Sequence, residues 1–296
     1  MILLAQSSGK MKTLTKTPNA PCKGRCFRSL FLNKITLLLV VFLSFSSLSA
    51  NAESEADLAK KLANPVASLI SVPIQANYDE NYGVNDQGEV WRINVQPVIP
   101  ISLDDEWNLI SRTILPIIDQ QDFPTIGDNE FGLGDTVQSL FFSPKKPTDS
   151  GLIWGAGPVF YFPTATDEKL GAEKWGLGPT LVMLKQQGPW TYGILSNHIW
   201  SVAGEDNRND INATFVQPFL TYITESKTTL GINTESTFDW ETDKWSVPVN
   251  FTVNQLLKIN NQLIQVGGGV RYWVESPAAG PEDWGLRLQA TLLFPK

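Results

Sequence analysis

Residues 283–294 read Asp-Trp-Gly-Leu-Arg-Leu-Gln-Ala-Thr-Leu-Leu-Phe, and large apolar side chains recur there at every second position. Because successive side chains of a β-strand point to opposite faces, one face of this strand would be apolar along its whole length. A stripe of this kind, ending in an aromatic residue near the terminus, is typical of the last strand of an outer-membrane β-barrel. It predicts an even number of similar strands, no transmembrane helix and an export signal. The apolar face consists of Trp284, Leu286, Leu288, Ala290, Leu292 and Phe294.

The N-terminal region has the composition of such an export signal. Residues 1–34 contain seven basic and no acidic side chains, and the apolar run Ile35–Phe45 follows them. This run is too short to span a bilayer as a helix, and Ala50-Asn51-Ala52 supplies small residues for cleavage. We therefore expect a cleaved signal peptide over residues 1–52. A single-pass anchor is the alternative, which the serines between positions 44 and 49 disfavour.

The predicted mature chain, residues 53–296, is acidic and lacks cysteine. Cys22 and Cys26 are the only two cysteines, and both precede the apolar run of the signal, so we expect neither a disulfide nor thiol chemistry. With the seven basic residues of the signal removed, 16 Lys and Arg remain against 30 Asp and Glu. This charge argues against a nucleic-acid partner.

Twelve segments of the mature chain have strand-like patterns. Their connections alternate in length, at about 9, 12, 11, 7, 5 and 8 residues in the odd-numbered gaps and about 5, 7, 4, 2 and 3 in the others. Because long extracellular loops opposite short periplasmic turns are the outer-membrane pattern, we predict an all-β fold, an antiparallel transmembrane β-barrel over residues 66–296. The segments span about 66–78, 88–101, 107–118, 131–143, 151–162, 174–185, 190–203, 211–224, 227–238, 244–258, 262–274 and 283–294.

Several of these segments have one apolar and one polar face, which indicates lipid on one side and a wet lumen on the other. The pattern is clearest in residues 88–101, 244–258 and 262–274. The third, fourth, seventh and eighth segments alternate less cleanly, and their faces cannot be assigned. The polar faces that can be assigned give the candidate pore-lining residues, which are Arg92, Asn94, Gln96, Asn233, Glu235, Asn250, Asn254, Gln265, Arg271, Arg287 and Gln289.

Four of these residues predict a charged constriction. In an antiparallel pair, the numbers of any two paired residues add up to the same value. If this value is about 558 for the last two strands, Arg271 lies directly opposite Arg287. The two guanidinium groups then repel unless acids, water or an anion lie between them. With Arg92 across the closing seam and Glu235 facing inward, we expect a polar constriction that selects small solutes. A salt-bridge network that only fills a narrow lumen is an equally good explanation.

Tryptophans lie near the ends of the predicted strands. This placement predicts an aromatic girdle at both membrane interfaces, and packing in a soluble core is the alternative. The residues concerned are Trp91, Trp107, Trp175, Trp190, Trp245 and Trp284 near strand starts, and Trp200, Trp240 and Trp273 near strand ends.

Residues 53–65 precede the first strand and have a helical pattern. Leu58, Ala59, Leu62 and Ala63 recur at helical spacing before Asn64-Pro65 ends the pattern. We expect a short periplasmic helix here. It either caps or plugs the barrel mouth or is a loosely ordered terminus, and the sequence leaves both open.

A set of motifs across the mature chain resembles one known family. The motifs are Leu62–Ala67 leading into Ile70–Pro73, Gln96–Pro100, Trp107–Thr113, Gly132–Asp135, Gly157-Pro158 with Phe162–Thr166, Asn197-His198 with Trp200, and Leu292–Lys296. They resemble the outer-membrane transporters grouped as MetA-pathway of phenol degradation proteins. The resemblance implies a β-barrel that passes small compounds, hydrophobic or aromatic ones among them, and it does not identify the substrate. Pro295-Lys296 depart from general barrel habit, so recognition by the barrel-assembly machinery would rest on Phe294.

The sequence therefore predicts a channel in the cell outer membrane for passive passage of small solutes. Its expected partners are outer-membrane lipid and lipopolysaccharide, the solute, and the barrel-assembly machinery during biogenesis. We expect no cofactor and no metal, because one histidine and no mature cysteine offer no zinc spacing. The acidic segment Glu205–Asp210 lacks the order of a calcium loop.

Two other classes of function remain as alternatives. A barrel enzyme acting on lipids would need a base, for which His198 is the only histidine, with Ser196 on its strand face. No Gly-x-Ser-x-Gly motif is present, so we predict no enzyme. A structural or adhesive surface barrel is the third possibility.

Overall fold

The computed structural model describes residues 55–260 and 262–294, in which one helix precedes a set of β-strands. The predicted signal peptide lies outside the described residues. The helix is α2 (Glu55–Leu62). The strands are β1 (Ile70–Tyr82), β2 (Gly88–Val95), β3 (Val98–Ser102), β4 (Trp107–Gln121), β5 (Glu130–Leu133), β6 (Thr136–Pro144), β7 (Leu152–Phe162), β8 (Lys174–Gln187), β9 (Trp190–Gly204), β10 (Asn212–Ile223), β11 (Thr228–Thr234), β12 (Ser236–Asp239), β13 (Lys244–Ile259), β14 (Gln262–Glu275) and β15 (Asp283–Phe294).

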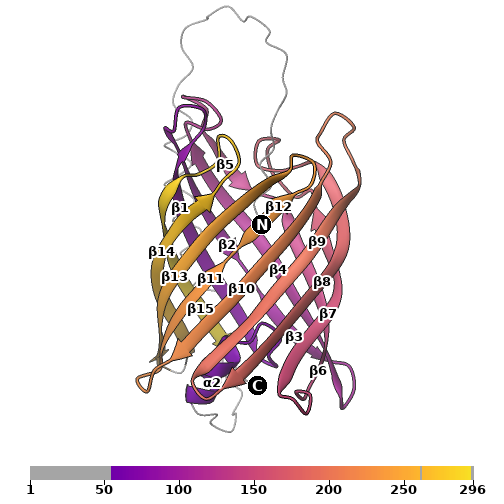
Figure 1. Ribbon diagram of the computed structural model, residues 1–296, viewed down its shortest axis with the longest axis vertical. Helices are drawn as coiled ribbons and strands as arrows, with labels where there is room; N and C mark the ends of the chain where they lie inside the picture. The colour runs from indigo at the N-terminus through magenta and orange to yellow at the C-terminus, as the bar shows by residue number, and fades with distance from the viewer. Residues whose placement is uncertain (1–54, 261, 295–296) are drawn as a thin grey trace, which may run out of the picture. The chain divides into compact units, whose positions relative to one another are not determined.

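The strands form one closed antiparallel barrel (Figure 1). Three strands are interrupted. β2 and β3 break at Gln96-Pro97 and β11 and β12 at Glu235 without a change of register, whereas the break between β5 and β6 at Gly134-Asp135 shifts the register against β4 by one residue. Pro97 has no N–H to donate to the ladder, which explains the first break. With each broken pair counted as one strand, twelve strands pair with their chain neighbours, and β15 pairs with β1 to close the sheet. The predicted 12-stranded antiparallel barrel is confirmed.

The two ends of the barrel differ. In Figure 1 the longer connections gather at one end, which we call the long-loop end, while α2 and the end of β15 lie at the other, the short-turn end. Strands extend farther toward the long-loop end than the sequence predicts, because β1 continues through Asp79 to Tyr82. Across residues 55–260 and 262–294, no helix has the length and apolar character needed to cross a membrane.

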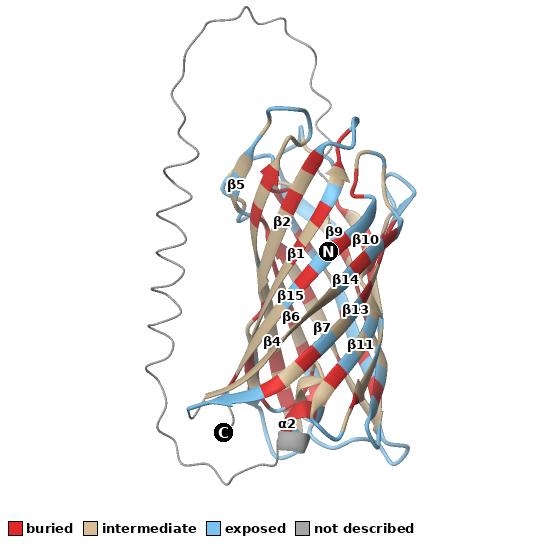
Figure 2. Cartoon of the chain, turned by 90° about the vertical axis from the view of Figure 1, so that its left-hand side faces the viewer, coloured by how far each residue is buried: buried red, intermediate tan, exposed pale blue. Residues whose placement is uncertain are grey.

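The outer surface of the barrel is apolar. Large hydrophobic side chains are exposed on most strands, among them Phe251, Val253, Leu286 and Leu288, and on several strands they alternate with buried residues (Figure 2). Because exposed apolar bands of this size are unfavourable in water, they indicate contact with lipid. Most of the predicted girdle tryptophans are exposed here, but Trp273 is 5% exposed and points inward. Its assignment to an interfacial girdle was wrong.

The chain from α2 to β1 covers the short-turn end from inside. Leu58 and Ala59 are buried in a cluster with Leu256 and Leu293 of the barrel interior. Two hydrogen bonds tie the segment to the wall, from Gln186 Nε2 to the Lys60 carbonyl at 2.8 Å and from Asn108 Nδ2 to Ser68 Oγ at 2.8 Å. The lumen is thus occupied at this end by the chain's own apolar side chains.

The connection between β7 and β8, residues 163–173, folds into the long-loop end. The Asp135 carboxylate accepts hydrogen bonds from the Ala165 and Ala172 amides at 3.0 and 2.6 Å, and from the Tyr161 hydroxyl at 2.8 Å. These bonds hold Leu170 in a buried cluster with Tyr82, Val90 and Ile118. A backbone loop anchored in this way narrows the entrance to the lumen.

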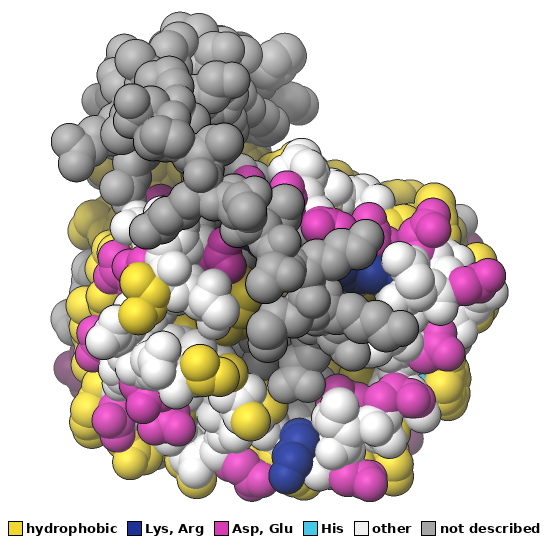
Figure 3. Space-filling model, turned by 90° about the horizontal axis from the view of Figure 1, so that it is seen from above, with side chains coloured by type: hydrophobic (Ala, Val, Ile, Leu, Met, Phe, Trp, Pro, Cys, Tyr) yellow, Lys and Arg dark blue, Asp and Glu magenta, His cyan; other side chains and the backbone are white. Residues whose placement is uncertain are grey.

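Acidic side chains are spread over the uncovered outer part of the long-loop end (Figure 3). Asp128 is one of them, and it pairs with Lys169 at 3.3 Å. A hydrogen bond from the Thr125 hydroxyl lowers the pKa of Asp128, and Lys169 lowers it further. The Asp128 carboxylate therefore remains ionised near neutral pH.

Candidate functional site

One side of the lumen is polar. We call the inward face of the strands from β11 through β13, β14, β15 and β1 to β2 the polar wall. Asn250, Arg271 and Arg287 on this face are only 1%, 2% and 1% exposed, although their strand neighbours Val270 and Leu286 are exposed. All the candidate pore-lining residues, from Arg92 to Gln289, lie on this wall. That they line a conducting path stays a prediction.

Arg287 on β15 is the most fully partnered charge of the polar wall. Its Nη1 and Nη2 donate to the two Glu235 carboxylate oxygens at 2.9 and 2.7 Å, and its Nε donates to Asn77 Oδ1 at 2.7 Å. A bidentate arginine–carboxylate pair is among the strongest polar contacts in proteins. Because Arg287 is buried, removing Glu235 would leave a charge without compensation.

Arg271 on β14 has a separate set of partners. Its Nη1 lies 3.4 Å from Asp79 Oδ2, and its guanidinium carbon lies 4.8 Å from the centre of the Trp273 ring. The Trp273 Nε1 donates to Asp79 Oδ1 at 2.9 Å. All three side chains are at most 5% exposed. The pair and the ring therefore form a second neutralised site inside the wall.

The predicted apposition of Arg271 and Arg287 is wrong. Arg271 pairs with Gly285, and Arg287 pairs with Gly269. The predicted register of β14 against β15 is therefore wrong by two residues. The last β14–β15 pair is Trp273 with Asp283, and beyond Trp273 strand β14 pairs with β13 alone. Each arginine thus lies opposite a glycine, which separates the two positive charges and leaves room for their carboxylates.

Arg92 and Arg112 face the same lumen without such partners. Among residues 55–260 and 262–294, neither forms an ion pair with a carboxylate. Arg112 Nη2 donates to Gln96 Oε1 at 2.7 Å, and Glu235 attracts it at longer range. Arg92 interacts electrostatically with the hydroxyls of Tyr82 and Tyr161. These two guanidinium groups are the charges of the lumen that are least compensated by the wall itself.

The opposite side of the lumen is apolar. We call the inward face from β4 through β6, β7, β8 and β9 to β10 the apolar wall because its large side chains are mostly apolar, although Arg112 and buried polar residues such as Ser139, Thr180 and Asn197 interrupt it. Its side chains form two buried clusters. The first consists chiefly of Ile110, Phe141, Val182, Leu184, Leu195 and Phe215. The second consists of Val137, Val159, Tyr161, Ile199, Ile211 and Ala213. The interior of this barrel therefore has its buried arginine–carboxylate pairs on one side and two apolar clusters on the other.

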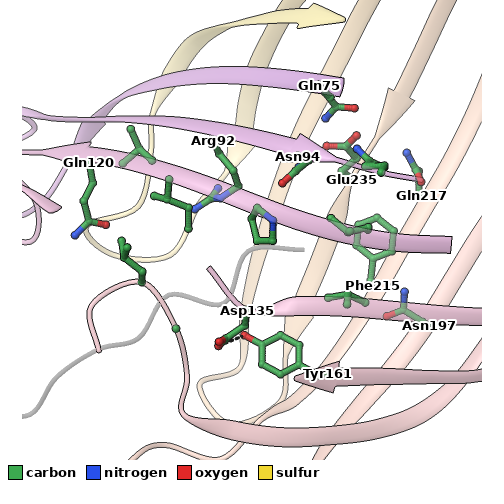
Figure 4. A pocket seen from close by; sticks show the side chains of 18 of the residues that line it. Gln75, Arg92, Asn94, Gln120, Asp135, Tyr161, Asn197, Phe215, Gln217 and Glu235 are labelled. Atoms are coloured by element: carbon green, nitrogen blue, oxygen red, sulfur yellow. Dashed lines mark hydrogen bonds between the residues drawn. The ribbon is translucent and has the colours of Figure 1, made fainter. Parts of the chain in front are cut away.

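A cavity of about 150 Å³ lies between the two walls. Figure 4 shows Arg92, Asn94 and Glu235 on one side of it and Tyr161, Phe215 and Asn197 on the other. Loop residues Lys169, Leu170 and Gly171 line it toward the long-loop end. Of the predicted residues, the cavity contacts Arg92, Asn94, Gln96 and Glu235. Arg271 and Arg287 do not line it, so the four predicted charges do not form one constriction around a shared space.

The alternative of a catalytic histidine has no support in the geometry. His198 lies on the strand face opposite Asn197, which lines the cavity, so its ring points away from the lumen. Its Nδ1 is 2.7 Å from Thr214 Oγ1, and its ring lies 4.0 Å from that of Trp200. Ser196 donates to the Phe215 carbonyl instead of to the histidine. In the described part of the chain, no group of three or more His, Cys, Asp or Glu is placed to hold a metal ion.

Sequence reasoning missed Asn77, Asp79, Tyr82 and Arg112. Asn77 and Asp79 continue the parity of Gln75, which lines the cavity, and this continuation of β1 was the available signal. Arg112 was not recognised as an inward-facing residue, because Ile110 and Ile114 lie on the same strand face and that face does not read as polar in the sequence.

Comparisons with known proteins bear on the fold. No protein-family model and no curated protein matches the chain, so the resemblance to the MetA-pathway family is not confirmed. The COG4313 outer membrane channel from Pseudomonas putida F1 has a similar structure, with a TM-score of 0.60 and 16% identity over 77% of this chain and 96% of that one. The outer membrane phospholipase of Salmonella typhi aligns with a TM-score of 0.48 and 10% identity over 82% and 99% of the two chains. The fold of this chain is that of outer-membrane β-barrels.

Proposed function

We propose that this protein is a channel of the outer membrane that passes small solutes through its lumen. The exposed apolar side chains on the barrel exterior support insertion into a bilayer, because they would be costly in water. The acidic side chains of the long-loop end support an orientation with this end outside the cell, where divalent cations link acidic groups to lipopolysaccharide. Export would depend on the predicted signal peptide.

The observation that carries this proposal is the cavity between two walls of different polarity. Phe215, Val137 and Ile114 offer apolar contact on one side, while Asn94, Gln96 and Arg92 offer hydrogen bonds on the other. Ligand sites commonly combine apolar surface with a few placed polar groups. The lumen thus suits solutes that have an apolar body and one polar group, and it suits bulk water and salt less well.

The two covered ends shape how such a channel would work. The segment from α2 to β1 covers the short-turn end, and the loop anchored by Asp135 narrows the other. Passage therefore requires one of these elements to move, and we expect a low conductance compared with an open porin.

Planar-bilayer recording of the purified mature protein tests the proposal. Ser139 is 4% exposed and lines the cavity, so Ser139→Trp should fill the space and remove most of the current. Phe142 is 45% exposed on the outer face of the same strand, and Phe142→Trp is the matched control that should leave the current unchanged. A wild-type barrel without current, or a Ser139→Trp variant with the wild-type current, would contradict the proposal and favour a structural barrel.

A further inference from the structure

The arginines of the lumen differ in how their charge is compensated. Arg271 and Arg287 have their own carboxylates at 3.4 and 2.7 Å, whereas Arg92 and Arg112 have none within the described chain. A partly buried cation without an anion has lost hydration that neutral partners, such as Gln96 Oε1 for Arg112, replace only in part. This difference marks the part of the lumen around Arg92 as a place for an external anion.

A second observation lies beside Arg92. The Tyr82 hydroxyl is in a side chain that is 1% exposed and interacts with the Arg92 guanidinium, which can only donate to it, so in the described chain no acceptor takes the hydroxyl hydrogen. The Asn197 side-chain oxygen, in a residue that is 8% exposed, is without a partner in the same part of the chain. Both residues line the cavity. Buried polar atoms normally have partners, so unpartnered ones facing a cavity indicate a missing ligand or water.

The other charges that face the cavity do not cancel this site. Glu235 is occupied by the two Arg287 nitrogens, and the Asp135 carboxylate accepts three hydrogen bonds. Lys169 at the loop end adds a further positive charge, although it pairs with Asp128. The lining therefore holds three cationic side chains, Arg92, Arg112 and Lys169, against two carboxylates, Asp135 and Glu235, and Glu235 is already paired with Arg287, so the balance favours an anion near Arg92.

We infer that the cavity binds a small monocarboxylate with an apolar body, with its carboxylate on Arg92 and Tyr82 and its body against Ile114, Ile118 and Val137. The guanidinium plane matches a carboxylate, and the phenol supplies a further donor. Arg112 also lines the cavity and adds positive potential. The cavity volume of 150 Å³ is below the range of about 300–1,000 Å³ typical of drug-sized ligands, so one ring or a short chain fits. This inference rests on the proposed function and names its solute class.

Isothermal titration with benzoate tests the inference on the mature protein in lipid nanodiscs, with empty nanodiscs as the blank. Benzyl alcohol serves as the neutral analogue of similar size. We expect benzoate to bind, and benzyl alcohol to bind about tenfold or more weakly, because a charge-assisted hydrogen bond is lost. Absence of benzoate binding, or equal affinity for the two compounds, overturns the carboxylate site.

Variants locate the site. Arg92→Gln should weaken benzoate binding by about tenfold to a hundredfold, Tyr82→Phe and Arg112→Gln by less, and benzyl alcohol should be unaffected by all three. Lys244→Gln, an exposed change at the start of β13, is the control that should bind benzoate as the wild type does. A heat-dependent shift in gel migration verifies that each variant is folded, and Arg92→Lys, which keeps the charge, should restore part of the affinity. Unchanged benzoate affinity in folded Arg92→Gln overturns the assignment.

The binding experiment and the bilayer recording test different statements. Binding at equilibrium requires no conduction, so a barrel that binds benzoate through Arg92 but carries no current contradicts only the channel. A barrel that carries current but does not bind benzoate contradicts only the carboxylate site.

Discussion

The polar and apolar walls are parts of the same sheet, yet they are stabilised in different ways. On the polar wall each buried charge of β14 and β15 has a specific partner, as in Arg287 with Glu235 and Arg271 with Asp79. On the apolar wall Phe141, Val182 and Leu184 are at most 2% exposed and pack against one another. The difference shows that the interior polarity of a barrel can change around its circumference. A solute in this lumen meets a polar surface on one side and an apolar surface on the other.

We expect the largest change in the free energy of unfolding when a polar side chain replaces an apolar one on the apolar wall. Leu184→Asn removes a buried leucine, which costs about 2–5 kcal/mol for a truncation of similar extent, and places an amide without partners among apolar groups, which costs about 1–3 kcal/mol more. The measurement is the free energy of unfolding in urea, followed by the heat-dependent gel shift of the barrel in lipid vesicles.

The reverse exchange on the polar wall is the matched comparison. Asn250→Leu removes the hydrogen bond from Asn250 Nδ2 to Asn233 Oδ1, which is 2.8 Å long, and should cost about 1–3 kcal/mol. If Leu184→Asn and Asn250→Leu lower the free energy of unfolding equally, the two walls do not differ in how strongly they disfavour a side chain of the other type.

The same division explains what the sequence could predict. The strands of the polar wall, such as β13 and β14, alternate between apolar and polar residues because one face meets lipid and the other meets polar groups. On β4, β6, β9 and β10 the inward face includes Ile110, Phe141, Leu195 and Phe215, so both faces are apolar and the alternation disappears. The number of strands and their approximate limits were still predictable, because turn residues mark the ends of strands on both walls.

The contacts within the polar wall were less predictable than its composition. Arg271, Arg287 and Glu235 were correctly placed on the inward face, but a register error of two residues assigned the wrong neighbours. Asp79 was expected in a loop, because a run of polar residues after Tyr78 resembles the end of a strand. The pairing of β1 with both β15 and β2 keeps this segment extended. Because β15 is far away in the sequence, the residues around Asp79 alone do not predict this pairing.

The next largest effect is expected at the Arg287–Glu235 pair. Glu235→Gln leaves the buried guanidinium group without a counter-charge and should lower the free energy of unfolding by about 3–5 kcal/mol. The double variant with Arg287→Met should recover most of this loss, because an apolar side chain of similar length replaces the unpaired charge. Urea unfolding of the three proteins measures both steps.

An exposed pair provides the control for this experiment. Lys169 and Asp128 are 39% and 38% exposed, so Asp128→Asn should change stability by less than about 1 kcal/mol. Equal losses for Glu235→Gln and Asp128→Asn would show that the polar wall is hydrated and not a buried network.

The smallest of these effects concerns the glycines opposite the arginines. A Cβ atom at position 285 would lie 2.5 Å from Asp79 Oδ1 and 2.6 Å from the Tyr78 carbonyl oxygen, so Gly285→Ala must displace the carboxylate that pairs with Arg271. We expect a loss of about 1–3 kcal/mol in the free energy of unfolding, typical of overpacking. Gly231→Ala, also on the polar wall, is the control, because its nearest neighbour is the Thr252 hydroxyl at 2.8 Å, which can rotate away. A neutral Gly285→Ala would mean that Asp79 has room to move, and the Arg271 pair would then be a loose contact in a hydrated lumen.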